Sequence, residues 1–270
     1  MTRTTQPATE LISLDLYNKK LGRVPASVWQ STNLERLNLA DNHLSLIAEE
    51  IGKLAELRML DLGHNELASL PETLFELKKL EFLYLSNNKL KSISTKIAQL
   101  KALIYLNFTD NQITTLPEEI GDLANLIEFR LYNNQINALP DSIGKLKNLQ
   151  ELHAMKNKLT SIPESVGNLK KLKKLVLQSN MISSLPDSLG GAVNLTDLDM
   201  RLNQLSSLPD SIGNLKHLRF LDLRANKLSA LPKSIAGLKN LEKLDLRWNT
   251  LTSIPTWLKP LEQRGCLIYL

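Results

Sequence analysis

Asparagine recurs every 23 residues along this chain, ten times without a slip. The set is Asn42, Asn65, Asn88, Asn111, Asn134, Asn157, Asn180, Asn203, Asn226 and Asn249. A fixed period of this length is typical of a solenoid, in which each unit buries its apolar face only against its neighbours. The repeat therefore predicts one elongated fold with a long repeated surface. Such a surface suits binding and usually lacks a catalytic cleft.

Residues 126–148 show what one unit contains. Phe129 and Leu131 are apolar and separated by one polar residue, which is the alternation of a short strand. Pro140-Asp141 opens the second half, where proline suits the first position of a helical turn and a carboxylate favours the positive end of its dipole. Gly144 argues against a long helix. Each unit is predicted to be a strand, a turn and a short helical or 3₁₀ return.

Stacked units place their strands side by side in a parallel sheet, about 4.8 Å apart. The helical side is bulkier, so the stack should curve with the sheet on its inner face. The repeated asparagine falls where the strand turns inward. Its amide both donates and accepts, so we expect an asparagine ladder that pairs buried backbone groups, a structural role.

The pattern LxxLxLxxNxLxxLPxxIGxLxx resembles the leucine-rich repeat in its 23-residue form. The resemblance covers Leu11 to Pro255 and includes cytosolic leucine-rich-repeat scaffolds of Ras signalling, the plant intracellular Ras-group relatives and bacterial leucine-rich-repeat proteins. It implies an α/β solenoid with a parallel sheet on the concave face and short helical segments on the convex face. It also implies protein binding through the strand face, without naming the partner.

The ends of the chain depart from the repeat. We expect residues 1–10 to be a flank, residues 11–255 to be about eleven repeats, and residues 256–270 to be a cap with a partial twelfth strand. Leu267 and Tyr269 are predicted to occupy core positions of that strand, and Trp257, Leu258 and Leu261 to close the apolar end. The first strand is weakly protected by sequence before it, so end-on association through that edge is an alternative to the expected monomer.

Strand alternation lets us assign side chains to the inner surface. A central cluster on adjacent strands is rich in residues typical of interfaces. It contains Met59, Phe82, Tyr84, Tyr105, Arg130, Tyr132, His153 and Met155. We interpret this cluster as the partner-binding site. The alternative is that the rings pack across strands only to stiffen the sheet.

A second feature lies nearer the C-terminus. Asp199, Asp222 and Asp245 form one column, and Arg201, Arg224 and Arg247 form the next. Each aspartate is two residues from its arginine, so the two side chains face the same way. A self-neutralising lattice is the favoured interpretation, because exposed pairs contribute only about 0–1 kcal/mol each. A docking strip for an acidic or mixed-charge peptide is the alternative, and on that ground the three arginines are included among the candidate partner-binding residues.

Composition and motifs limit the chemistry. The net charge of +5 is mildly basic, and the lysines of the outer side are interspersed with carboxylates, so neither nucleic-acid nor membrane binding is predicted. Cys266 is the only cysteine, and no secretory signal or apolar run of about 20 residues is visible, which favours a cytoplasmic, reducing compartment. No phosphate loop, zinc motif or nucleophile elbow occurs, so no cofactor is expected. His43, His64 and Asp41 make only a weak case for a metal contact.

We therefore expect a non-enzymatic protein-binding module or signalling scaffold, either free-standing or an effector delivered by a bacterium. The alternative from another class is the sensing part of a larger enzyme, such as a kinase or ubiquitin ligase. A basic nucleic-acid or membrane binder is a third hypothesis, which steep salt dependence of binding would favour.

Overall fold

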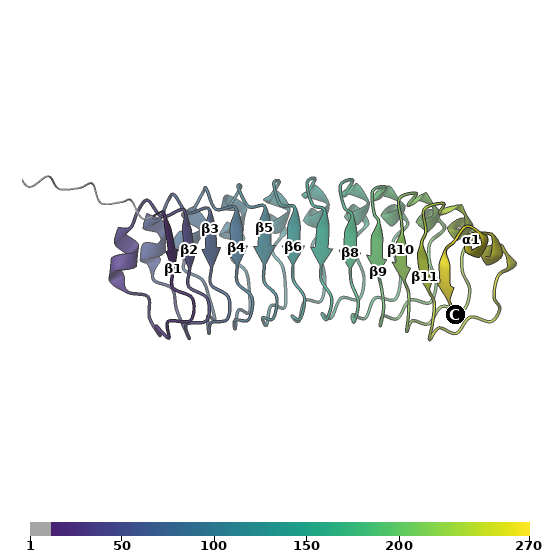
Figure 1. Cartoon of the computed structure of the whole chain (residues 1–270), viewed down its shortest axis with the longest axis horizontal. Helices are drawn as coiled ribbons and strands as arrows, with labels where there is room; N and C mark the ends of the chain where they lie inside the picture. Colours follow the sequence, from purple (N-terminus) through teal and green to yellow (C-terminus); the bar gives the residue numbers. More distant parts are fainter. Residues whose placement is uncertain (1–11) are drawn as a thin grey trace, which may run out of the picture.

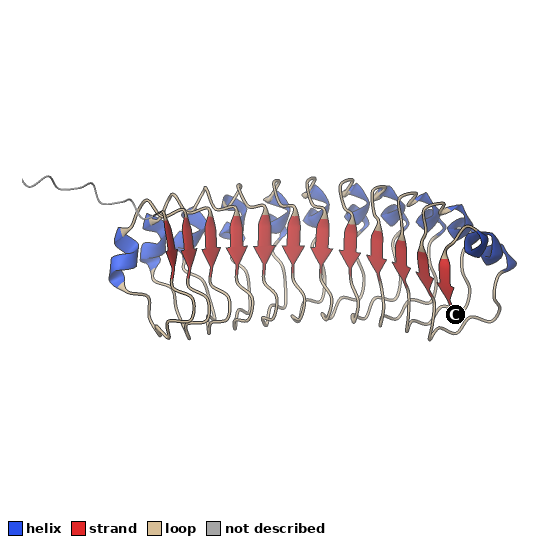
Figure 2. Ribbon diagram, viewed as in Figure 1, coloured by secondary structure: helices blue, strands red, loops and turns tan. Residues whose placement is uncertain are grey.

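The computed structural model describes residues 12–270 of the chain. These residues form an elongated, gently curved solenoid in which the strands line up along one side and the short helices along the other (Figures 1 and 2). One parallel sheet of 12 strands runs in sequence order from β1 to β12. The predicted architecture is confirmed.

Each strand is three residues long. The strands are β1 (Ser13–Asp15), β2 (Arg36–Asn38), β3 (Met59–Asp61), β4 (Phe82–Tyr84), β5 (Tyr105–Asn107), β6 (Glu128–Arg130), β7 (Glu151–His153), β8 (Lys174–Val176), β9 (Asp197–Asp199), β10 (Phe220–Asp222), β11 (Lys243–Asp245) and β12 (Leu267–Tyr269).

The return segments are 3₁₀ helices, and one α-helix precedes the last strand. They are η1 (Ala26–Gln30), η2 (Glu49–Lys53), η3 (Glu72–Glu76), η4 (Thr95–Gln99), η5 (Glu118–Asp122), η6 (Asp141–Lys145), η7 (Glu164–Asn168), η8 (Asp187–Gly191), η9 (Asp210–Asn214), η10 (Lys233–Gly237), η11 (Thr256–Leu258) and α1 (Lys259–Gln263). Within residues 12–270, none of these helices has both the length and the apolar character needed to cross a membrane.

The core is a continuous column of leucine and isoleucine side chains between the sheet and the 3₁₀ helices. The middle residue of each inner strand points into it and is almost fully buried, as Leu83 and Leu106 show. The residues on either side of it point to the concave surface and are half-buried in most strands. This alternation positions the candidate site.

The ladder asparagines hydrogen-bond neighbouring turns together. Asn134 is typical: its Oδ1 accepts the Ile113 N–H at 3.0 Å, and its Nδ2 donates to Phe108 O and Leu131 O, both at 2.9 Å. The residue before each ladder asparagine has a left-handed backbone, with φ between 51° and 59° from Asp41 to Trp248. A non-glycine residue rarely adopts that conformation. We infer that the hydrogen bonds of the asparagine side chain hold the backbone in the turn that ends each strand.

The cap differs from the sequence expectation in one respect. Leu258 and Leu261 are buried and Trp257 packs against the core, as predicted. Leu267 and Tyr269, however, are exposed, and Ile268 is the residue of β12 that packs against the core, so their assignment to core positions was wrong. The cause is a shift of one residue: Leu244 pairs with Ile268, 24 residues on, because α1 and Gly265, with φ of +95°, lengthen the last turn.

Candidate protein-binding face

The aromatic part of the concave face lies over β3, β4 and β5. Met59 is the strand partner of Phe82, and Phe82 is the strand partner of Tyr105. The Tyr84 and Tyr105 rings pack across the strands, with centroids 4.9 Å apart and planes inclined by 36°. All four side chains are half-buried. The rings therefore stiffen the sheet and also leave an apolar surface open to solvent.

Burial raises the pKa of both the Tyr84 and the Tyr105 hydroxyls. Both phenols are therefore neutral at neutral pH. Each can donate a hydrogen bond at the same time as its ring offers apolar contact, a combination that makes tyrosine frequent at interfaces.

A charged group adjoins the rings on β6, β7 and β8. Arg130 Nε donates to Glu128 Oε1. His153 Nε2 lies 2.9 Å from Glu151 Oε2, and Lys174 Nζ lies 3.3 Å from Glu151 Oε1. Burial pushes the pKa of Glu151 up, but the hydrogen bonds from His153 and Lys174 outweigh it and lower the pKa overall.

The predicted members of this group differ in how much they expose. The Arg130 side chain is 36% exposed, whereas the His153 side chain is only 13% exposed. Tyr132 and Met155 lie two positions beyond the ends of β6 and β7 and are half-buried. The structure thus brings the eight predicted cluster residues together on one face, on or just after neighbouring strands. Arg130 and the tyrosines are the members best placed to touch a partner.

Metal binding is the other chemistry this charged group allows. The ligand atoms of Glu128, Glu151 and His153 lie within 4.8 Å of one another, which makes them the one group of three metal-ligating side chains found among residues 12–270. Arg130 and Lys174 already neutralise the two carboxylates. We therefore assign no metal to them. His43 does not join Asp41, since its ring nitrogen faces Glu66 instead, at 3.8 Å.

The C-terminal columns form a lattice of ion pairs. Arg201 binds Asp199 and reaches Asp222 on the next strand, at 2.7 and 3.6 Å. Arg224 repeats the pattern with Asp222 and Asp245, at 2.6 and 3.4 Å. Each arginine therefore has its charge balanced inside the chain, in keeping with the self-neutralising interpretation. The three predicted arginines lie together on the concave face, but their hydrogen-bonding groups are engaged by aspartates.

Asp245 ends the lattice and is fully buried, with a side-chain exposure of 0%. Arg247 Nη2 donates to its Oδ2 at 2.7 Å, and Lys243 lies 3.8 Å away. Burial alone would raise the pKa of Asp245, but hydrogen bonds from Arg247 and the charges of Arg224 and Arg247 lower it overall.

This lowered pKa gives a pH-dependent prediction. A carboxylate whose pKa is lowered by folding stabilises the fold above its unfolded pKa, and that stability is lost as the pH falls through the lowered folded pKa. Asp245→Asn should therefore be clearly less stable than the wild type at neutral pH, and the difference should shrink as the pH falls through and below the ordinary aspartate range. Urea unfolding across pH measures this. Asp187→Asn, at an exposed site in η8, is the control, and a difference for Asp245→Asn that does not change with pH would contradict the prediction.

Two features of the face were not among the predicted site residues. Glu128 and Glu151 orient Arg130 and His153, although neither glutamate was predicted as a site residue. Tyr269 joins the face because of the register shift, and its ring lies 5.0 Å from the Arg247 guanidinium carbon. The one available signal was charge: each glutamate stands two residues before a basic residue on the same strand.

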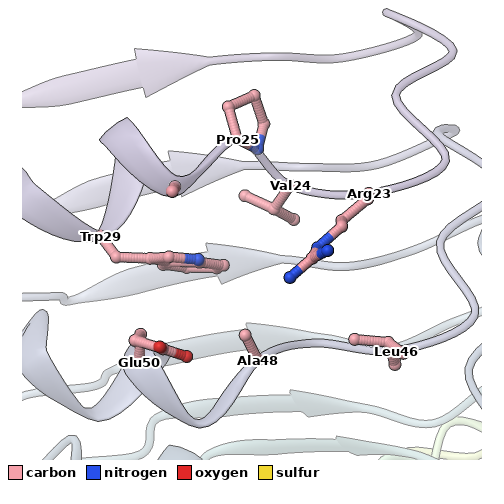
Figure 3. A pocket seen from close by; sticks show the side chains of 8 residues that line it. Arg23, Val24, Pro25, Trp29, Leu46, Ala48 and Glu50 are labelled. Atoms are coloured by element: carbon pink, nitrogen blue, oxygen red, sulfur yellow. The ribbon is translucent and has the colours of Figure 1, made fainter.

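A cavity lies away from this face, between the segments that lead into η1 and η2. In Figure 3 the Trp29 ring and the Arg23 side chain approach it from opposite sides, above Ala48 and Leu46. Ala48 stands where most units have proline, and the smaller alanine side chain fills less of this space than proline would. No predicted site residue lines this cavity.

A family described as "Leucine rich repeat" matches residues 9–67, 32–90, 55–113 and 193–251, and one described as "Leucine-rich repeat region" matches residues 88–208. Among curated protein sequences, none matches the chain.

Solved structures of proteins from bacteria and plants are similar to this chain. A leucine-rich repeat protein of Leptospira interrogans is 28% identical, with 95% of each chain covered and a TM-score of 0.54. The functional domain of InlJ from Listeria monocytogenes is 26% identical, with 96% of this chain and 52% of that chain covered and a TM-score of 0.81.

The third similar structure is the ectodomain of the Arabidopsis thaliana membrane receptor kinase GASSHO1/SCHENGEN3, solved in complex with CASPARIAN STRIP INTEGRITY FACTOR 2. It is 31% identical, with a TM-score of 0.79, and 92% of this chain is covered. This chain spans only 34% of that ectodomain's length.

Proposed function

Because the chain belongs to the leucine-rich repeat family, we propose that it is a protein-binding module that takes its partner on the concave face, over β3 to β7. Protein binding is the typical role of this family. The observation that carries the placement is the half-exposed row of Met59, Phe82, Tyr84 and Tyr105, which continues into Arg130 and Tyr132. Tyrosine and arginine beside apolar surface are the usual anchors of protein interfaces.

The electrostatics of the face support this placement over the C-terminal strip. Arg201 and Arg224 each form ion pairs with two aspartates, so a partner there would compete with internal pairs. The aromatic row is uncharged, so a partner there would displace no ion pair, and the Tyr84 and Tyr105 rings pack against each other. The Arabidopsis ectodomain that the chain resembles is bound to a named factor, which is in keeping with binding as the role of this chain. We expect a free-standing scaffold or a delivered effector, acting in a reducing compartment since Cys266 is the only cysteine.

The experiment is a triple substitution, Tyr105→Ala, Arg130→Ala and Tyr132→Ala, in the full chain. The partner is first captured with the wild type from the source cells, identified and purified. Its affinity for the two chains is then compared by calorimetry. We expect the triple variant to bind at least about 100-fold more weakly, because removal of interface anchors commonly costs that much.

The matched control replaces Lys53, Glu76 and Lys239, all exposed at the helical side, with alanine. It should bind like the wild type, and both variants should keep a thermal midpoint within a few degrees of it. Equal affinity of the triple variant and the wild type would show that the partner docks elsewhere.

A further inference from the structure

The C-terminal end of the face shows how this fold holds a guanidinium group. Asp245 on β11 and Tyr269 on β12 are strand partners. Between them lies the side chain of Arg247, two residues after Asp245. Its Nε and Nη2 donate to the carboxylate at 2.9 and 2.7 Å, and its guanidinium carbon lies 5.0 Å from the Tyr269 ring centroid. The group is bound by a charged pair on one side and a cation–π contact on the other.

The same frame recurs at the other end of the face without the arginine. Asp61 on β3 and Tyr84 on β4 are strand partners. The Asp61 Oδ1 accepts the N–H two residues on, at 2.8 Å, just as Asp245 Oδ1 accepts the Arg247 N–H. The residue two on is Gly63, however, and the equivalent residue on the preceding strand is Ala40. Neither has a side chain that reaches the carboxylate.

Asp61 therefore keeps an uncompensated charge. Among residues 12–270 no basic side chain forms an ion pair with it, unlike Asp199, Asp222 and Asp245. Burial raises the pKa of Asp61; the hydrogen bond from the Gly63 N–H and the charge of His64 oppose this rise without reversing it, and the charge of Asp15 adds to it. The Asp61 charge in turn contributes, after burial, to the raised pKa of the Tyr84 hydroxyl.

The surface next to this pair can accept the rest of a ligand. A concave cavity of about 450 Å³ lies over β1 to β4 and has Met59, Phe82 and Tyr84 as its apolar wall. It also contains Asp15 and Arg36. Together with Asp61, the strand partner of Tyr84, they give this region two acidic side chains and one basic side chain.

We propose that Asp61 and Tyr84 bind an arginine side chain of an extended segment of the protein partner, with an apolar neighbour of that arginine in the adjoining cavity. The guanidinium occupies the place that Arg247 fills between Asp245 and Tyr269. This inference rests on the proposed function, since it names the chemistry of a partner on the same face.

The probe is the peptide acetyl-Leu-Ala-Arg-amide, compared with the same peptide carrying citrulline, which keeps the shape of arginine and removes the charge. Alternate residues of an extended peptide point the same way, so leucine and arginine reach the surface together. The chain has five methionines, so ¹³C-methyl-methionine spectra are simple to follow. Met59 reports the cavity, while Met155 and Met181 report other surfaces.

Three variants of the full chain sharpen the test. Asp61→Asn keeps the turn-forming oxygen and removes the charge. Gly63→Arg supplies an arginine from the chain itself, as at Arg247. The two atoms nearest to a Cβ at this position both belong to side chains, Asp61 Oδ1 at 3.1 Å and Ser86 Oγ at 3.2 Å. Asp197→Asn makes the same charge change elsewhere on the face and is the matched control.

In the wild type the arginine peptide should shift the Met59 signal, and the citrulline peptide should bind about tenfold more weakly, as expected for loss of a charge-assisted contact. Asp61→Asn should bind the arginine peptide more weakly than the wild type by about the same factor. Gly63→Arg should abolish the Met59 shift with no loss of thermal stability, and Asp197→Asn should bind the peptide as the wild type does.

Equal responses to the two peptides, an unchanged response in Asp61→Asn, or no Met59 shift up to about 10 mM peptide would overturn the inference, since one such contact is expected to give millimolar binding. The natural partner takes no part in this measurement. If the peptide measurement overturns the inference but the triple variant loses partner binding, the proposed function still stands.

Discussion

Replacing Asn134 with alanine is expected to lower the free energy of unfolding by about 3 kcal/mol, because the buried Ile113 N–H loses its side-chain acceptor while the Phe108 and Leu131 carbonyls each lose one of their two asparagine donors. The amide accepts from Ile113 N–H and donates to Phe108 O and Leu131 O, and Asn134 is 8% exposed. Alanine leaves two carbonyls and one N–H without this partner in a place that water does not reach readily. Urea unfolding followed by circular dichroism measures the loss.

Asn148→Ala is the matched control for this prediction. Asn148 is half-buried and donates to Ala124 O at 2.9 Å, but this hydrogen bond lies at the exposed surface, so water can replace it. We expect a loss below about 1 kcal/mol. Similar losses for Asn134→Ala and Asn148→Ala would contradict the role of the asparagine ladder in holding the turns together.

Replacing Gly167 with alanine is expected to destabilise the fold by about 3 kcal/mol, through overlap with the backbone of the next turn. A Cβ at Gly167 would lie 2.1 Å from the carbonyl oxygen of Ser188, and a backbone atom cannot move aside as a flexible side chain can. The two 3₁₀ helices, η7 and η8, would have to separate. The same unfolding experiment measures the cost.

Gly237→Ala tests whether contact, rather than the loss of glycine, causes the effect. Gly237 ends η10, and the nearest atom to a Cβ there is the flexible end of Lys216, at 3.4 Å. We expect a change within about 0.5 kcal/mol, or slight stabilisation from a stiffer unfolded chain. If Gly237→Ala were as damaging as Gly167→Ala, the close packing of the 3₁₀ helices would not be the reason for the glycines.

The period of the asparagines was enough to predict the repeating unit and its strand, because one structural unit must fit one repeat for neighbours to stack. The prediction failed at β12, where Leu267 and Tyr269 turned out to be exposed. There the chain leaves the period, since α1 and Gly265 add one residue. Periodicity carries no information on register once the repeat ends, and a shift of one residue turns every side chain of a strand to the other face.

The candidate site was predictable in part. Alternation placed Tyr84, Tyr105 and Arg130 on one face, but not their engagement with each other or with Glu128, which depends on rotamers set by packing. The free carboxylate of Asp61 had a visible signal in the sequence. It is followed two residues later by glycine, whereas each aspartate of the C-terminal lattice is followed there by arginine.

The proposed function requires that partner contacts concentrate on the concave face over β3 to β7. Hydroxyl-radical footprinting of the chain, alone and with the purified partner, tests this most directly because it reports exposure side chain by side chain. We expect Met59, Tyr84, Tyr105 and Tyr132 to become protected, while the exposed Met181 and Trp248 oxidise as in the free chain. Protection of Met181 or Trp248 with unchanged oxidation of the three tyrosines would contradict the account.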